Sequence, residues 1–292
     1  MEKNELLKKF REEADTYLEK TTSSTKDKKK QASYINKKVT ELRNTYTDAI
    51  LITDDSSAKK LDNILLTAYV SYIVMLEYRN KVWKYDYMAF SRRIGEMWEP
   101  FCKIPFSYPV KDLDIYDPPS FKSVQLALET EIKEYINTLE IGDNKKSELL
   151  EYYNRQSLLI GSGSISLDLD LHFTQNNIYY NVDYKSGFNS NEKGNTNRLL
   201  MVASIYKGLS TKNKTLLFVR QPEAENNHYL QTLKNSSLWE VYTSDDTYNK
   251  IHEFTGFDLK SWMTAHMNWA EDISPEFKEY LIENDLSKYL TW

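Results

Sequence analysis

The chain has 292 residues, a formal net charge of −5 and one cysteine, Cys102. A single cysteine excludes an internal disulfide and a cysteine-rich zinc site, and the four histidines lack the close spacings of a histidine-built metal site. The acidic net charge excludes a general basic attraction for nucleic acid, so a polyanion would have to be met by local patches or by bound cations.

The sequence shows no sign of a membrane segment or an export signal. No stretch reaches the roughly 18 uncharged apolar residues that span a membrane, and the charged start MEKNELLKKF lacks the apolar region of a signal peptide. The single cysteine fits a reducing compartment. We therefore expect a soluble, cytoplasmic protein.

Residues 1–90 are predicted to form a helical N-terminal region, because apolar residues recur at helical spacing in three stretches. Between the first two, the lysine-rich stretch TTSSTKDKKKQ is interpreted as a solvated connection, with contact to phosphate as the alternative. The three apolar faces include Leu6, Phe10 and Ala14, then Ile35, Val39 and Leu42, then Leu61, Leu65 and Ala68.

Residues 91–292 are predicted to form an α/β core with a central mixed β-sheet flanked by helices. The segment SRRIGEMWEPFCKIP predicts a helix that is disturbed near Pro100 and ends before Pro105. The proline-marked loop KDLDIYDPPSF follows. Residues from about 120 to 155 then form a helical insertion of one or two helices, broken at IGDNKK.

Strand patterns begin after the insertion. GSGSISLDLDLHF alternates apolar and polar residues strictly, IYYNVDYK alternates more loosely, and TLLFVRQP is a short apolar run. The helical pattern NTNRLLMVASIYKGL lies between the second and third strands and ends near Gly208. Residues 239–241 predict a further short strand, and the tail from 258 to 292 is predicted to be helical, with Pro275 opening the last helix.

The turn between the first two predicted strands determines which of their residues face each other. If Asn176-Asn177 form a two-residue turn, facing residues are those whose numbers add to 353, as 176 and 177 do. Asp170 then faces Asp183, and Asp168 faces Lys185, with Cβ atoms about 4.5–5.5 Å apart. A three-residue turn would shift the pairing by one and place Asp170 and Asp183 on opposite faces.

Two facing carboxylates destabilise a sheet unless a positive charge lies between them. Lys185 can serve in part, because residues two apart on a strand share a face. A divalent cation would serve better, since Mg²⁺ takes hard oxygen ligands at about 2.0–2.1 Å. The pattern predicts a Mg²⁺ site formed by Asp170 and Asp183, with Asp168 as a further candidate ligand and Lys185 beside it.

The hairpin resembles the active-site signature of a known superfamily. Asp170, the turn and Asp183-Tyr184-Lys185 resemble the signature of the PD-(D/E)xK phosphodiesterases, which include most type II restriction endonucleases. The resemblance covers about residues 160–222 and includes the strand, strand, helix, strand order. Leu169 stands where the pattern has proline, and the doublet of Asp168 and Asp170 leaves the first acid open. Asp170 is favoured because it faces Asp183.

The resemblance implies a restriction-endonuclease-like core and a Mg²⁺-dependent endonuclease that cleaves double-stranded DNA at a specific short sequence. Asp170 and Asp183 would hold one or two Mg²⁺ ions, and Lys185 would orient or help to activate the attacking water. Many members carry a glutamate on a helix before the hairpin, which suggests Glu96 as a further ligand, with Glu99 as the alternative. A homodimer is implied, because cutting two strands of a symmetric target needs two sites.

The loop SGFNSNEKGNTNR after Lys185 is a candidate base-reading element. Asparagine can bond adenine N6 and N7, and arginine or lysine can bond guanine O6 and N7. The alternative is that its Asn and Gly residues only make turns. The candidates for DNA binding are Asn189, Asn191, Lys193, Asn195, Asn197 and Arg198.

Three alternative interpretations stay open. A structure-specific DNA repair or recombination nuclease would share the same catalytic residues, and a non-catalytic DNA-binding protein would need no Mg²⁺ site. Asp183 and Lys185 could also be charges on the solvated face of an edge strand. His172 falls on the predicted acidic face, where it could assist proton transfer or be only a partly exposed strand residue.

Overall fold

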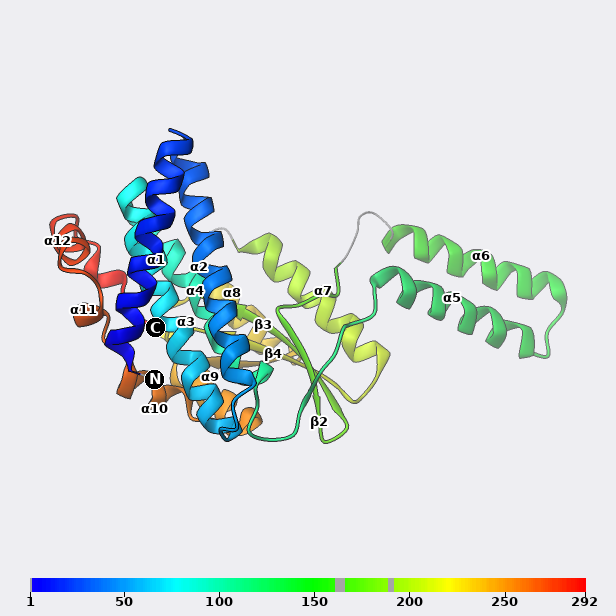
Figure 1. Cartoon of the computed structure of the whole chain (residues 1–292). Coiled ribbons are helices and arrows are strands. Elements are labelled where there is room, and N and C mark those ends of the chain that lie inside the picture. The colour runs from blue at the N-terminus through cyan, green and yellow to red at the C-terminus, as the bar shows by residue number, and fades with distance from the viewer. Residues whose placement is uncertain (1, 161–165, 189–191) are drawn as a thin grey trace.

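The computed structural model describes residues 2–160, 166–188 and 192–292. Within them the chain forms one five-stranded mixed sheet with helices on both faces (Figure 1). The predicted α/β class is confirmed. No helix in these ranges is both long enough and apolar enough to cross a membrane.

The N-terminal part is helical, as its periodicity predicts. The lysine-rich stretch is mostly helix, because Asp27 accepts hydrogen bonds from the N–H groups of Lys29 and Lys30 and so begins the second helix early. The third helix is buried on nearly every side and packs against its neighbours. The helices are α1 (Lys3–Ser24), α2 (Lys28–Leu51) and α3 (Ser57–Val82).

Helix α4 (Tyr87–Ser107) extends further than predicted. The expected end before Pro105 is wrong, since Pro105 lies inside the helix. Pro105 and Phe106 are buried, and the Phe106 ring packs 5.1 Å from Phe173 and 6.4 Å from Phe254, measured between ring centroids. Burial of these side chains outweighs the backbone hydrogen bond that proline cannot donate.

The sheet has the strand order β1-β2-β3-β4-β5. Strand β2 pairs antiparallel with both β1 and β3, whereas β3, β4 and β5 pair parallel with one another. The two-residue strand β1 falls in the segment predicted to be a loop, so that prediction missed it. The strands are β1 (Asp114–Ile115), β2 (Leu171–Gln175), β3 (Ile178–Lys185), β4 (Asn213–Val219) and β5 (Trp239–Thr243).

Alternate residues of β3 face different halves of the protein. Val182 and Tyr184 belong to the core that contains α1 to α4, together with Phe218 of β4. Asp183 alternates with them and therefore faces the other half, which is covered by α7 (Lys193–Leu209) and α8 (His228–Asn235). The strand thus places one charged residue beneath α7 while its neighbours anchor it in the larger core.

The helical insertion is a hairpin of α5 (Phe121–Thr138) and α6 (Asp143–Ile160). It lies between β1 and β2 in the chain and extends away from the sheet (Figure 1). The break between its helices falls at the predicted place. On α5 only Val124 and Ile136 are buried, so the hairpin contributes little to either core.

The C-terminal part of the chain forms short helices that further cover the sheet. Pro275 opens α12, as predicted, and Ser274 caps that helix by accepting the N–H of Phe277. The tail returns to α4, where Trp292 Nε1 donates to the carbonyl of Ile94 at 3.0 Å. The elements are η1 (Glu223–Glu225), α9 (Asp245–Thr255), α10 (Leu259–His266), α11 (Trp269–Asp272), α12 (Pro275–Glu283) and η2 (Ser287–Tyr289).

The strand predicted over residues 161–173 is wrong in part. Residues 161–165 lie outside the described ranges, and residues 166–170 are not strand. Leu169 N–H donates to His172 Nε2 at 2.9 Å, and the Asp170 carboxylate accepts the N–H of Tyr184 at 2.7 Å. These side chains take hydrogen bonds that a continued ladder would make between backbones, so pairing begins only at Leu171.

The turn and the register of the hairpin are confirmed. Asn176 and Asn177 have φ values of 53° and 64°, and the paired residues run from Leu171 with Val182 to Gln175 with Ile178. Two consecutive positive φ angles give the backbone twist that suits a two-residue hairpin turn. The register predicted from this turn therefore holds over the whole of β2.

We predict that Asn177→Val lowers the free energy of unfolding by about 1–2 kcal/mol, because a β-branched residue is strained at positive φ. Asn177→Gly should leave it unchanged or raise it slightly. Urea unfolding monitored by circular dichroism measures both. The control Asn154→Val, at an exposed helical position where the two residues have similar propensity, should change little. An Asn177→Val variant as stable as this control would contradict the prediction.

Candidate functional site

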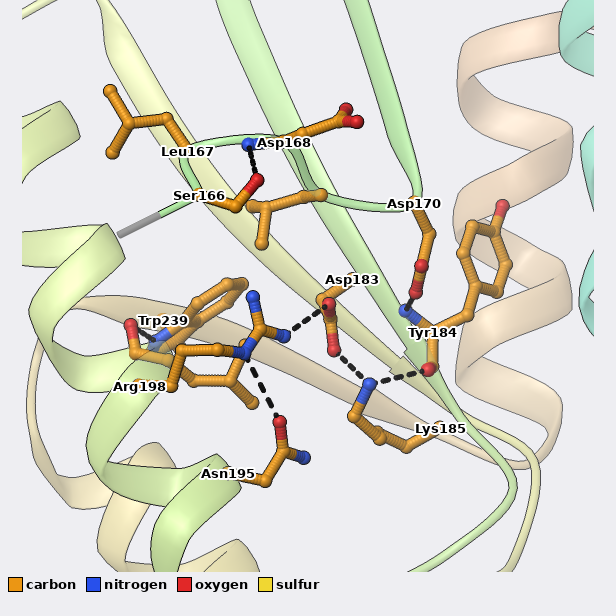
Figure 2. A network of polar contacts seen from close by, with 12 residues as sticks. Ser166, Leu167, Asp168, Asp170, Asp183, Tyr184, Lys185, Asn195, Arg198 and Trp239 are labelled. Carbon is orange, nitrogen blue, oxygen red and sulfur yellow. Dashed lines mark hydrogen bonds and ion pairs between the residues drawn. The ribbon is translucent and has the colours of Figure 1, made fainter. Parts of the chain in front are cut away.

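The centre of the site is a buried carboxylate at the carboxyl end of β3. Asp183 is only 1% exposed, and Figure 2 shows two cationic side chains directed at it. The Lys185 ammonium makes an ion pair with Oδ2, and Arg198 Nη2 from α7 lies 3.4 Å from Oδ1. A buried carboxylate is costly unless positive charge and hydrogen bonds compensate it, and here both partners come from nearby in the chain.

The pKa of Asp183 is raised. Burial is the largest cause, and the charge of Asp170 raises the pKa further, whereas Lys185 and Arg198 act in the opposite direction. Lys185 Nζ also donates to the carbonyl of Tyr184 at 3.0 Å, so its ammonium is shared between this carbonyl and the Asp183 carboxylate. The two cations therefore only partly offset the cost of burying this carboxylate.

The structure separates the two aspartates that the sequence left open. Asp170 is half-buried, and its Oδ2 accepts the Tyr184 N–H at the end of β3 (Figure 2). Asp168 is 77% exposed at its side chain and points away from Asp183 (Figure 2). Neither the predicted pairing of Asp168 with Lys185 nor that of Asp170 with Asp183 forms, because the ladder ends at Leu171.

Helix α4 brings a further carboxylate to the site. Burial raises the pKa of Glu99, the charge of Asp170 raises it further, and Lys103 and Lys185 lower it. Glu99 is therefore close enough to Asp170 and Lys185 for their charges to change its pKa. Its only ion-pair partner among the described residues is Lys103, at 3.2 Å.

Glu96 is engaged differently from Glu99. It forms ion pairs with Arg92 at 2.7 Å and with Arg93 at 3.6 Å. Helix α4 approaches the end of β3 at Gly95, where an added Cβ would lie 2.4 Å from Ser186 Oγ. Glu99 lies one turn beyond Gly95 and so shares its face, whereas Glu96 lies about 100° from Gly95 around the helix.

The oxygen atoms at this site suit Mg²⁺. That ion usually takes one or two protein carboxylates and completes its shell with water and phosphate. Asp170 and Asp183 supply such oxygens, and Asp183 Oδ2 is buried with no hydrogen bond of regular geometry besides its ion pair with Lys185. No group of three or more His, Cys, Asp and Glu side chains suited to a metal occurs in the described ranges, so the fit depends on these two carboxylates.

The predicted DNA-reading residues are spread around the start of α7. Asn189 and Asn191 lie outside the described residues, and Lys193 and Asn197 are exposed. Asn195 donates to Glu192 at 3.1 Å and accepts from Arg198 at 3.4 Å. Arg198 itself is directed toward Asp183, a contact that the sequence pattern does not predict.

His172 is buried rather than partly exposed. Its Nε2 accepts the N–H of Leu169, so its Nδ1 carries the proton and donates to Asn181 Oδ1, at 2.9 Å in both cases. Burial lowers the pKa of His172, and Asn181, Asp168, Asp170 and other groups only partly offset this effect. With both ring nitrogens engaged, His172 holds the chain that leads to Asp170.

We predict a pH-dependent contribution of His172 to stability. Because its pKa is lowered in the folded state, the unfolded chain binds more protons below the ordinary value of about 6.5. The contribution is complete above that pH and is lost as pH falls through it toward the folded pKa. The free energy of urea unfolding should fall more between pH 7 and pH 5 in the wild type than in His172→Gln. His228→Gln, at an exposed histidine, should behave as the wild type, and an equally steep fall in His172→Gln would contradict the neutral assignment.

The site is thus a buried carboxylate with two cations, a second carboxylate across a hairpin and a third on a neighbouring helix. Two elements, β3 and α7, supply the ion pairs, and α4 closes the other side. Compared with protein-family models, with curated proteins and with solved structures, the chain gives no match.

Proposed function

We propose that the chain is a Mg²⁺-dependent endonuclease that cleaves double-stranded DNA at a specific short sequence, in the manner of a type II restriction enzyme. The observation that carries the proposal is the placing of Asp183 and Lys185 at the carboxyl end of β3, with Asp170 across the hairpin. This set of groups is that of the PD-(D/E)xK signature. The proposed setting is the cytoplasm.

Asp170 and Asp183 would hold Mg²⁺, and Glu99 supports them in place of the expected Glu96. The bound ion would neutralise the scissile phosphate and lower the pKa of a water molecule. Glu99 is favoured because the pKa influences connect it with Asp170 and Lys185, whereas Glu96 is neutralised by two arginines. Asp168 is not part of this proposed set, because it is exposed and directed elsewhere.

Lys185 would act directly on the phosphate and the attacking water. Its ammonium is mostly buried and lies against Asp183, so its position is fixed before the substrate arrives. A positive charge held in place in this way stabilises the charge that develops on the phosphate oxygens without reorganisation during the reaction. Arg198 would have a positioning role, since it holds the second oxygen of Asp183.

A homodimer is part of the proposal. Each chain offers one such site, and a cut through both strands of a symmetric DNA target needs two. The acidic net charge of −5 does not oppose DNA binding at the site itself, because Mg²⁺ and local cations would meet the phosphates there.

Lys185→Met should reduce plasmid cleavage by about a hundredfold or more, because it removes the ammonium and keeps the length of the side chain. Purified protein, plasmid and Mg²⁺ are compared with an EDTA arm, and agarose gels measure the rate. The control Lys133→Met, on exposed α5, should cleave as the wild type. Discrete fragments would support sequence-specific cutting. Cutting of only branched or damaged DNA would favour a structure-specific nuclease, and metal-independent or absent cutting would sink the nuclease proposal.

The acidic residues offer two matched comparisons. Asp170→Asn and Asp183→Asn should abolish cleavage, because each removes a proposed Mg²⁺ ligand, whereas Asp168→Asn should retain it. Glu99→Gln should slow cleavage more than Glu96→Gln. The same plasmid assay measures all five variants, with thermal melting to verify folding. Activity lost in Asp168→Asn but kept in Asp170→Asn would reverse the proposed ligand set.

A further inference from the structure

A cavity of about 550 Å³ lies beside the proposed catalytic residues, between α4 and the carboxyl ends of β3 and β4. Its wall on the α4 side includes Tyr87 and Arg92, and its wall on the sheet side includes Ser186 and Arg220. Ligands of open α/β sheets bind beyond the carboxyl ends of the strands, which is where this cavity lies. Its size is within the range of small-molecule sites.

Arg220 brings a positive charge to the cavity. It follows β4 directly, and its backbone N–H donates to the carbonyl of Lys185 at 2.9 Å, so the backbones of the two residues are neighbours at the ends of β4 and β3. Its Nη1 donates to the carbonyl of Thr291 at 2.9 Å, but its Nε is buried without a hydrogen bond. Within the described part of the chain no carboxylate forms an ion pair with it. Burial lowers its pKa, and Tyr248 and the charge of Glu225 offset this effect only in part.

A half-buried guanidinium without a carboxylate partner favours an anion. Its planar donors suit the oxygens of a phosphate, which can take up the free Nε–H. Arg92, on the opposite wall, is already paired with Glu96 at 2.7 Å and is therefore a weaker candidate. The backbone of Arg220 is bonded to that of Lys185, and Glu99 of the proposed ligand set lines the cavity, so a phosphate at Arg220 would lie at the same end of the sheet as the proposed site.

The lining of the cavity includes exposed aromatic and apolar side chains. Tyr87 is 61% exposed and Met88 is 66% exposed, although both lie beside a buried part of α4. Tyr289 lines the cavity from the C-terminal part of the chain. Exposed aromatic rings near a phosphate-binding cation are typical of surfaces on which a base stacks, and such stacking tolerates every base.

We propose that this cavity binds the nucleotide next to the scissile phosphodiester, with its phosphate on Arg220 and its base against Tyr87. The inference rests on the proposed nuclease function and adds the position of the substrate strand. That strand would pass from Lys185 across the ends of β3 and β4 toward α4. A base held in the cavity is removed from the stack of its neighbours, so the DNA is distorted beside the cut.

The test measures binding of thymidine 5′-monophosphate, inorganic phosphate and thymidine to the full chain by isothermal titration calorimetry, in EDTA. Arg220→Gln should weaken nucleotide binding about tenfold or more, since a hydrogen-bonded charge is lost. It should leave the binding of thymidine unchanged, because thymidine has no phosphate. Tyr87→Ala should weaken nucleotide binding about fivefold or more and leave inorganic phosphate unaffected.

Two matched controls lie on the distant helical hairpin. Arg155→Gln removes an exposed arginine that pairs with Glu151, and Tyr135→Ala removes a ring that is 65% exposed. Both should bind the nucleotide as the wild type does. Arg220→Lys, which keeps the charge, should bind more tightly than Arg220→Gln, and this comparison holds even if loss of the bond to Thr291 lowers stability.

The proposal is overturned if the wild type does not bind the nucleotide, or if the Arg220 and Tyr87 variants bind as well as their controls. An effect of Arg220→Gln without an effect of Tyr87→Ala would show an anion site and would also overturn it. Because calorimetry in EDTA requires no cleavage, its outcome is distinct from that of the plasmid assay. Nucleotide binding without cleavage would refute the nuclease function alone, and cleavage without nucleotide binding would refute the subsite alone.

Discussion

The site depends on one electrostatic constraint, the burial of the Asp183 carboxylate. A carboxylate that is 1% exposed loses most of its hydration, and the nearby charge of Asp170 makes ionisation still less favourable. The protein meets this cost with Lys185 from the same strand and Arg198 from α7. The position of the buried Asp183 carboxylate therefore determines where these two cationic side chains must lie.

Packing on the opposite face keeps this arrangement rigid. Tyr184, between Asp183 and Lys185, is buried in the larger core and contacts the rings of Trp98 and Phe218. Its backbone N–H is held by Asp170 and its carbonyl by Lys185. One residue therefore connects the hydrophobic packing of α4 and β4 with the hydrogen bonds of the site, so the charged groups cannot shift without disturbing the core.

The hairpin could be predicted from sequence because its information is local. Asn176-Asn177 alone set the register, and the alternation of the strand then placed Asp183 on one face. The position of Glu99 near the hairpin could not be predicted in the same way, since it depends on how α4 packs at Gly95. The spacing of four residues places Gly95 and Glu99 on one face of a helix, but only the packing of α4 shows that this face contacts the end of β3. Asp170 lies outside the ladder of β2 and β3 for a similar reason, because its side chain, in place of a backbone carbonyl, accepts the N–H of Tyr184.

The long insertion between β1 and β2 bears on how the sheet assembles. β2 meets β3 across a two-residue turn, whereas Asp114 of β1 must find Thr174 after the whole α5 and α6 hairpin has intervened. The entropy lost on closing a loop grows with its length, and contacts distant in sequence form more slowly than local ones. During folding, the hairpin of β2 and β3 is therefore expected to acquire its register first. The short edge strand β1 is expected to pair with β2 only after α5 and α6 no longer lie between them.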